Sequence, residues 1–267
     1  MGENSKIAWT DATWTVTTGC QAVSSGCARC YAATMTKRLA AMGLPEYQGL
    51  LGDSGHFNGN VRLLPKNLDK PLHWKKPRMI FVDSMSDLFH EAVPFEFIDR
   101  VFAMMKRCGQ HVFQVLTKRP ERMAAYLQTL KIAWPLPNVW LGTSVENQTA
   151  LDARWGHLRA YPAAIRFLSI EPLLGPLDLR AKWVQGWGTD DWIICGCESG
   201  PKRRPCEPEW IRSIVDQCAA AGVSCFVKQF PLARHRKGNP APHAVSHDPA
   251  EWPEWARVRQ FPEVSHA

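Results

Sequence analysis

Three cysteines lie close together near the N-terminus, in the segment of residues 18–31 that reads TGCQAVSSGCARCY. Cys20, Cys27 and Cys30 have the spacing C-x6-C-x2-C, which is typical of metal ligands rather than of core packing. Tetrahedral zinc sites and most iron–sulfur clusters take four protein ligands. A local group of three thiols therefore predicts either a distant fourth ligand or an iron left open for a substrate or cofactor.

Short apolar runs rich in β-branched residues alternate along the chain with amphipathic stretches. The runs predict strands near residues 14–17 and at residues 79–82, 112–116, 139–142, 165–169, 192–196 and 223–227. The amphipathic stretches predict helices at residues 31–42, 95–108, 121–130, 149–160 and 209–221, the last of which Gly222 is expected to end. Strands that alternate with helices predict parallel pairing. The fold class is therefore α/β, a full or partial TIM-like (β/α) barrel, with an open doubly wound sheet as the alternative.

Polar residues follow every predicted strand, and the cysteines follow the first of them. The other polar ends read DSMSD at 83–87, TKR at 117–119, SVE at 144–146, SIEP at 169–172, ESG at 198–200 and KQ at 228–229. In parallel α/β folds, ligands bind at the carboxyl ends of the strands. We expect these ends to face one cleft, although residues such as Asp87 or Asn147, taken singly, also fit the simpler role of helix caps.

The length and composition suit one large globular domain, with 267 residues, 45% hydrophobic and 21% charged. Residues 1–230 are expected to form the barrel domain of a monomer. Residues 43–77 are long for a connection between a strand and a helix, so they predict an excursion or lid over the cleft. Residues 231–267 are rich in proline and show no period, which predicts an irregular C-terminal tail.

Cysteine usage bears on the cellular compartment. The chain has no signal-peptide pattern and no apolar run of membrane-spanning length, so we expect a cytoplasmic protein without a membrane partner. Thiols stay reduced there, and nine cysteines then favour metal or redox chemistry over disulfides. Outside the triad, Cys108, Cys218 and Cys225 are expected to be small buried hydrophobic residues.

The charge balance suggests an acidic partner. The chain carries 32 lysines and arginines against 25 acidic residues, a net charge of +7. A basic rim beside a cleft is what phosphate backbones require. The predicted nucleic-acid contacts are the basic residues after two strand ends, namely Lys118, Arg119, Lys202, Arg203 and Arg204. The alternative is an ordinary solvated surface.

Several of these motifs together resemble one protein family. They are residues 14–31, RMIFVDSMSDLFH at 78–90, FQVLTKRP at 113–120, LGTSVE at 141–146, SIEPLL at 169–174 and CESG at 197–200. Over residues 5–230 the sequence is similar to the phage-associated, radical-SAM-like family of uncharacterised proteins found in phages and bacteria. It is also distantly similar to spore photoproduct lyase, a DNA repair enzyme.

The resemblance implies a [4Fe-4S] cluster held by Cys20, Cys27 and Cys30, with S-adenosyl-L-methionine bound at the open iron. One electron, from a donor such as flavodoxin or ferredoxin, then cleaves the sulfonium and yields a 5′-deoxyadenosyl radical that abstracts hydrogen from a substrate carbon. Two features depart from the usual radical-SAM pattern. The usual spacing is C-x3-C-x2-C, and the aromatic residue before the last cysteine is here Arg29, with Tyr31 following.

Strand order assigns the remaining polar residues to the cofactor. An acidic or hydroxyl acceptor is needed near the methionine amino group, and we assign Ser84, Ser86 and Asp87 to it. The ribose hydroxyls are assigned to Ser144 and Glu146. These assignments follow from the expectation that the carboxyl ends of neighbouring strands lie side by side.

The predicted catalytic residues are Glu171, Cys197 and Glu198. The Cys197 thiol is a candidate hydrogen donor to a substrate radical, and its alternative role is to fill a small pocket. With the basic groups, these residues predict a radical-SAM enzyme that acts on a nucleobase in DNA. The reaction would be the repair of a pyrimidine photoproduct or the modification of a base.

Two other function classes stay open at this point. A zinc-binding module would use the three cysteines and a distant histidine such as His73 or His90, and it would be colourless. An iron–sulfur protein that binds nucleic acid or senses redox state would be brown but would not bind S-adenosyl-L-methionine.

Overall fold

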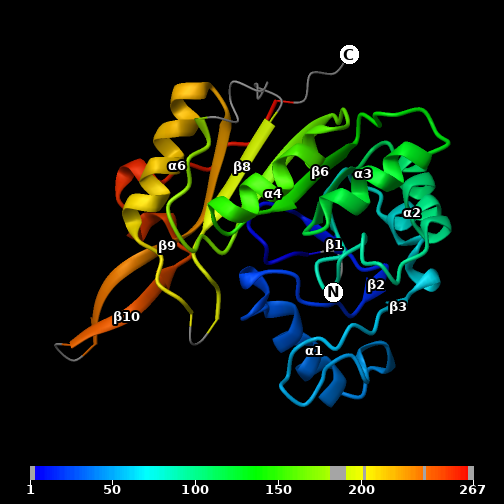
Figure 1. The fold of residues 1–267 in the computed structure, drawn as a ribbon, viewed down its shortest axis with the longest axis horizontal. Helices are drawn as coiled ribbons and strands as arrows, with labels where there is room; N and C mark the ends of the chain where they lie inside the picture. Colours follow the sequence, from blue (N-terminus) through cyan, green and yellow to red (C-terminus); the bar gives the residue numbers. More distant parts are fainter. Residues whose placement is uncertain (1–3, 181–190, 201–202, 237–238, 264–267) are drawn as a thin grey trace. The chain divides into compact units, whose positions relative to one another are not determined.

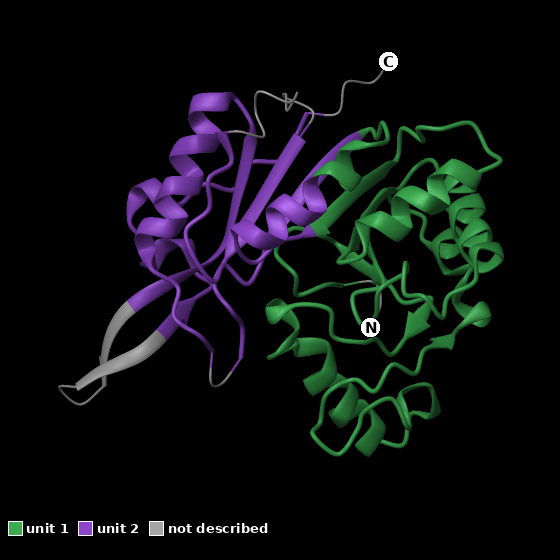
Figure 2. Cartoon of the chain, in the orientation of Figure 1, with its two compact units in different colours: residues 1–143, 156–164 green, residues 144–155, 165–267 purple. Residues whose placement is uncertain are grey.

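The computed structural model describes residues 4–180, 191–200, 203–236 and 239–263. The chain divides into two compact units, which Figure 2 colours separately. Unit 1 comprises Met1–Thr143 and Gly156–Ala164, and unit 2 comprises Ser144–Trp155 and Ile165–Ala267. Each unit is described by itself below.

The sheet of unit 1 has the strand order β1 (Ala12–Trp14), β4 (Met79–Val82), β5 (Val112–Thr117) and β6 (Val139–Ser144), whose last residue belongs to unit 2. All three pairings are parallel. The strands are almost wholly buried and apolar, as strands covered on both faces must be. Parallel pairing brings the segments that follow these strands to the same edge of the sheet.

Two helices of unit 1 show why the chain folds this way locally. Helix α2 (Phe95–Arg107) buries a stripe at helical spacing that includes Ile98, Val101 and Met105. Helix α3 (Pro120–Thr129) begins with a proline in its first turn and contributes Tyr126, whose ring contacts Phe102 of α2 at 5.1 Å between centroids. The two helices can be followed at the right of Figure 1.

The cysteine segment leads through η1 (Ser25–Cys27) into helix α1 (Tyr31–Ala41). The following residues hold the short helices η2 (Pro45–Tyr47), η3 (Pro65–Asn67) and η4 (Lys70–His73), and a two-stranded antiparallel ladder joins β2 (Thr17–Thr18) to β3 (Arg62–Leu63). A small apolar cluster of Ala32, Tyr47 and Met85 packs this excursion onto α1. The excursion predicted at residues 43–77 is therefore tied to the cysteine segment; its role as a lid stays a prediction.

The sheet of unit 2 has the order β7 (Ile165–Ile170), β8 (Asp191–Gly196), β9 (Ser224–Arg236) and β10 (Asn239–Ser246). The first three strands are parallel, and β10 is antiparallel to β9. A partly buried ion pair of 3.1 Å joins Arg166 and Asp191, which face each other in the β7–β8 register. The unit also holds α6 (Pro208–Ala221), most of α4 (Gln148–Arg159), η5 (Pro249–Glu251) and η6 (Glu254–Ala256).

The predicted α/β class with parallel strands is confirmed, as open sheets in the described part of each unit rather than a closed barrel. The predicted strands and helices match within about one residue at most ends, and Gly222 ends α6 with φ 67° as expected. The first predicted strand differs, because it is split into β1 and β2. The carboxylate of Asp83 accepts the N–H groups of Val16 and Thr17, which therefore cannot continue the β1–β4 ladder.

A second difference lies in the segment expected to be an irregular tail. Strand β9 continues beyond Phe230 to Arg236 and pairs with β10, and Figure 1 shows this hairpin extending from the rest of unit 2. Pro231 and Pro240 lie in the paired strands although they lack an N–H group, and the register shifts between Ala241 and Ala244. Proline content therefore concealed the strands. In the described residues, no helix combines the length and apolar character needed to cross a membrane.

Candidate functional site

The cysteine segment begins at a backbone position that only glycine suits. Gly19 has φ 88°, and a Cβ atom there would lie 2.1 Å from the carbonyl oxygen of Asn60. Gly19 also bridges to Ser86, whose hydroxyl donates to the Gly19 carbonyl. Gly26, the other glycine of the segment, lies in η1 and does not have a positive φ. Cys20 is thus directed by a turn fixed from two sides.

The three cysteines of the segment differ from the others in exposure. Cys20, Cys27 and Cys30 are half-buried, whereas the six remaining cysteines are buried, as expected for Cys108, Cys218 and Cys225. The N–H of Cys27 donates to the Ser24 carbonyl at 2.9 Å, and Cys30 occupies the N-cap position of α1 without a side-chain capping hydrogen bond. Tyr31 donates a hydrogen bond from its hydroxyl to the carbonyl of Ser84. The segment is therefore anchored at both ends to residues 84–86.

The segment is chemically suited to hold an iron–sulfur cluster. Among the residues that the structure describes, no three His, Cys, Asp or Glu side chains are gathered as a metal-ligand group. The donor set fits such a group in its chemistry, because three half-buried cysteines lie on one anchored segment. Burial, and then the Asp87 carboxylate, raise the pKa of the Cys20 thiol to about 11. A bound metal would have to displace that proton.

Asp87 is buried and binds four protein donors. Its carboxylate accepts hydrogen bonds from the Thr117 hydroxyl at 2.7 Å, the Phe89 N–H at 3.0 Å and the Lys118 N–H at 3.1 Å, and it pairs with the Arg119 guanidinium at 3.1 Å. The end of β4 is thereby joined to the end of β5. Because both oxygens of its carboxylate already accept bonds from protein donors, Asp87 contributes to the site by holding those neighbouring groups in position.

Asp83, the first residue after β4, lies in the same unit but is not among the predicted site residues. It is buried, has φ 55°, and accepts hydrogen bonds from two backbone N–H groups and the Thr17 hydroxyl. Burial outweighs these bonds and raises the pKa of Asp83 to about 7. Its position at a strand end was visible in the sequence, but its burial was not.

We expect Asp83 to make the stability of the protein fall as pH rises from about 4 to about 7. In this window the unfolded chain has released the proton that folded Asp83 retains, so the free energy of unfolding drops by about 1.4 kcal/mol per pH unit. Above the folded pKa the stability levels off. Urea unfolding at several pH values measures this slope.

The matched variant is Asp83→Asn, which should remove the slope. Its amide oxygen can accept the N–H groups of Val16 and Thr17, its NH₂ can donate to the Thr17 hydroxyl, and asparagine tolerates positive φ. Asp69→Asn is the control, because that side chain is 64% exposed. An unchanged slope in Asp83→Asn would show that another group carries the pH dependence.

The two histidines considered as distant metal ligands are placed differently. His73 is exposed and lies 3.7 Å from Asp69. His90 is buried, and its Nδ1 accepts the Ala92 N–H at 3.1 Å, so its proton belongs on Nε2. Nε2 has no hydrogen-bond partner among the described residues. Metal ligation through Nε2 would require the proton to move to Nδ1 and break the bond to Ala92, which argues against the zinc alternative with His90.

In unit 2, two predicted residues meet at the start of α4. The Glu146 carboxylate is buried and lies 3.0 Å from the Arg154 guanidinium, which also donates to the Ser144 carbonyl at 2.7 Å. Arg154 was not predicted, since it lies inside a helix eight residues beyond Glu146. The assignment of Ser144 and Glu146 to ribose hydroxyls stays a prediction.

The three predicted catalytic residues also lie in unit 2. Glu171 forms an ion pair with Lys228 of β9 at 3.0 Å, and the two side chains are 10% and 22% exposed. Glu198 accepts the Arg204 N–H at 2.8 Å and pairs with its guanidinium, which closes the loop after β8. Cys197 is buried, which agrees with the pocket-filling role as well as with a chemical one.

The predicted nucleic-acid contacts are of two kinds. Arg119 and Arg204 are paired with carboxylates, and Arg119 is only 4% exposed. Lys118 and Arg203 are partly exposed and lie in units 1 and 2 respectively. Lys202 lies outside the described residues. The sequence indicated positive charge at these positions. It did not indicate which guanidinium groups form ion pairs with carboxylates of the same chain.

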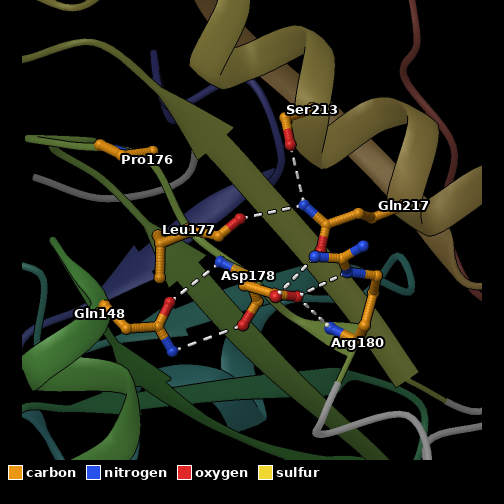
Figure 3. A pocket seen from close by; sticks show the side chains of 7 residues that line it. All are labelled: Gln148, Pro176, Leu177, Asp178, Arg180, Ser213 and Gln217. Atoms are coloured by element: carbon orange, nitrogen blue, oxygen red, sulfur yellow. Dashed lines mark hydrogen bonds and ion pairs between the residues drawn. The ribbon is translucent and has the colours of Figure 1, made fainter.

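A cavity of about 420 Å³ in unit 2 contains no predicted site residue (Figure 3). Two glutamine side chains in its wall pair with the backbone of residues 177–179. Gln148 accepts the Asp178 N–H at 2.9 Å, and Gln217 accepts the Leu179 N–H at 2.7 Å. Because both amides are used in this way, the cavity is a place where α4 and α6 hold a connecting segment.

The fold and the cysteine segment thus define an α/β protein with three half-buried cysteines on one anchored segment. The chain belongs to a family described as a protein of unknown function, DUF5131, whose model matches residues 4–251. No curated protein matches the sequence.

Solved structures of spore photoproduct lyase are similar to the chain. One mutant has 11% identity and a TM-score of 0.49, covering 76% of this chain and 60% of that chain. Another has 12% identity and a TM-score of 0.48, covering 90% and 70%. A third, with bound AdoMet and dinucleoside spore photoproduct, has 11% identity and a TM-score of 0.46, covering 73% and 58%. The chain spans about 60% of the length of the first of these structures.

Proposed function

We propose that the protein is an iron–sulfur enzyme of the radical S-adenosyl-L-methionine type whose substrate is a nucleobase in DNA. The observation that carries the proposal is the contrast between three half-buried cysteines on one anchored segment and six fully buried ones. A structural cysteine is normally a buried, inert residue. Three cysteines that are only half-buried, beside a strand edge rich in polar groups, are better explained as ligands.

In this proposal Cys20, Cys27 and Cys30 hold the cluster. When bound, a [4Fe-4S] cluster with S-adenosyl-L-methionine supplies the one-electron cleavage that yields a 5′-deoxyadenosyl radical. The protein's own part is to fix the thiols in place. The Ser86 hydroxyl holds the Gly19 carbonyl, and the Tyr31 hydroxyl holds the Ser84 carbonyl, so both ends of the segment are kept against the end of β4.

The choice of DNA is supported by charge. The net charge of +7 favours a polyanionic partner, and Lys118 and Arg203 are partly exposed cations at strand ends. A base inside a duplex would have to leave the stack to reach a reactive group. A redox partner such as flavodoxin or ferredoxin would supply the electron.

We expect the anaerobically reconstituted protein, given dithionite and S-adenosyl-L-methionine, to form 5′-deoxyadenosine. Formation should increase when single-stranded or duplex DNA is added, and the increase should fade as salt is raised, because phosphate contacts are screened. Chromatography of the quenched reaction measures 5′-deoxyadenosine without DNA, with single-stranded DNA and with duplex DNA.

The Lys118→Glu variant should reduce the DNA-dependent increase and leave the DNA-free rate unchanged. If 5′-deoxyadenosine forms at the same rate with and without DNA, the substrate is instead a small molecule or a peptide. A brown protein that forms no 5′-deoxyadenosine would instead favour a redox or sensing role.

A further inference from the structure

Arg119 is a buried cation that contacts the cysteine segment. It is 4% exposed, and its Nη2 donates to the Gln21 carbonyl oxygen at 3.3 Å. The Cys20 Sγ lies 3.6 Å from that same oxygen. The Arg119 guanidinium and the Cys20 thiol thus share the Gln21 carbonyl oxygen as a partner. Arg119 therefore lies beside Cys20, although the two residues are far apart in sequence.

The position of the guanidinium is fixed from the other side by Asp87. The Nη1–Oδ2 distance is 3.1 Å, and both side chains are less than a tenth exposed. The Thr117 hydroxyl and the Lys118 N–H hold the same carboxylate, so the carboxylate cannot turn away from Arg119. A guanidinium in this arrangement is a poor candidate for binding a phosphate at the surface, which was its sequence-based assignment.

A fixed charge in such a place acts strongly on a neighbouring redox centre. At a given distance, an electrostatic interaction is stronger in a buried site than in water, because the local dielectric constant is lower. The potential of an iron–sulfur cluster depends on its net charge, on hydrogen bonds to its sulfurs and on solvent exposure. A cluster that gains an electron gains negative charge, and a nearby cation stabilises that reduced form.

We propose that Arg119 is a positioning residue that raises the reduction potential of a cluster bound at Cys20, and that Asp87 limits this effect by partly neutralising the guanidinium. The inference rests on the proposed function, since it requires a cluster at the three cysteines. It assigns to the Asp87–Arg119 pair the task of setting how readily the cluster accepts an electron.

The test is a dithionite titration of the reconstituted protein, followed by electron paramagnetic resonance of the reduced cluster. In Arg119→Gln, loss of the charge should shift the equilibrium towards the oxidised form by about tenfold, which is about 59 mV lower for a one-electron couple. Arg119→Lys keeps the charge and should retain at least half of this difference. Asp87→Asn should shift the potential in the opposite direction.

Lys106→Gln is the control, because this cation is exposed and lies in the last turn of α2, shortly before β5 begins. It should leave the potential unchanged. Opposite shifts in Arg119→Gln and Asp87→Asn support the inference, whereas equal shifts in Arg119→Gln and Arg119→Lys, or none in either, overturn it. If Arg119→Gln loses its cluster, the comparison of wild type with Arg119→Lys and Asp87→Asn decides. A wild-type protein without any cluster would refute the proposed function instead.

Discussion

Replacing Cys20, Cys27 or Cys30 by alanine, one at a time, should abolish iron binding by the anaerobically purified protein. A site with three protein ligands has no spare thiolate, and the six other cysteines are buried and cannot substitute. The loss should be all or none rather than graded. Iron and sulfide analysis, together with the brown absorbance of the cluster, measures it.

Cys218→Ala is the matched control. Cys218 is fully buried in α6 of unit 2, and its removal should leave the iron content unchanged. Iron that survives a single substitution in the triad would disprove the ligand assignment. A colourless wild-type protein that holds zinc and loses it in the same variants would support the zinc-binding alternative.

The second large effect is expected from Gly19→Ala. The new Cβ would lie 2.1 Å from the Asn60 carbonyl oxygen, closer than the 3.0 Å below which real Cβ atoms essentially never occur. The backbone must therefore shift, and φ 88° adds strain for any L-residue. We expect a loss of about 4 kcal/mol or more in the free energy of unfolding. Urea unfolding and cluster retention are the two measurements.

Gly59→Ala separates the collision from the strain. Gly59 has a similar φ of 90°, but its added Cβ would meet nothing closer than 3.9 Å. The free energy of unfolding of this variant should fall only by the cost of the left-handed conformation, about 1–2 kcal/mol. Equal losses in the two variants would mean that the contact with Asn60 relaxes without cost.

The sequence predicted the elements well because the hydrophobicity of a segment and its period are local properties. The apolar run 79–82 and the polar residues that follow it were both apparent, and β4 has those bounds. The partners of these polar residues were not apparent. The bond from Arg119 to Gln21 spans 98 residues, and no local pattern distinguishes an arginine that binds a carboxylate from one that faces solvent.

The same limit explains Asp83 and Asp87. Both follow β4 in one motif, yet the carboxylate of Asp83 accepts bonds from Val16 and Thr17, whereas that of Asp87 binds Arg119. Their spacing places both carboxylates at a strand end. It does not indicate which donor groups each carboxylate binds. Hydrogen bonds between distant segments decide this, and only the folded unit brings those segments together.

The anchoring of the cysteine segment has a consequence for the order of events during synthesis. The thiols are made first, but Ser86 lies 67 residues after its partner Gly19, and Arg119 lies 98 residues after Gln21. At about 5–20 residues per second, the interval before Arg119 is added is roughly 5–20 s. The three cysteines therefore spend that time on a growing chain that lacks its supports. Under the proposed function, a cluster would be inserted into the finished geometry only after unit 1 has folded, and the nascent segment would have to stay reduced until then.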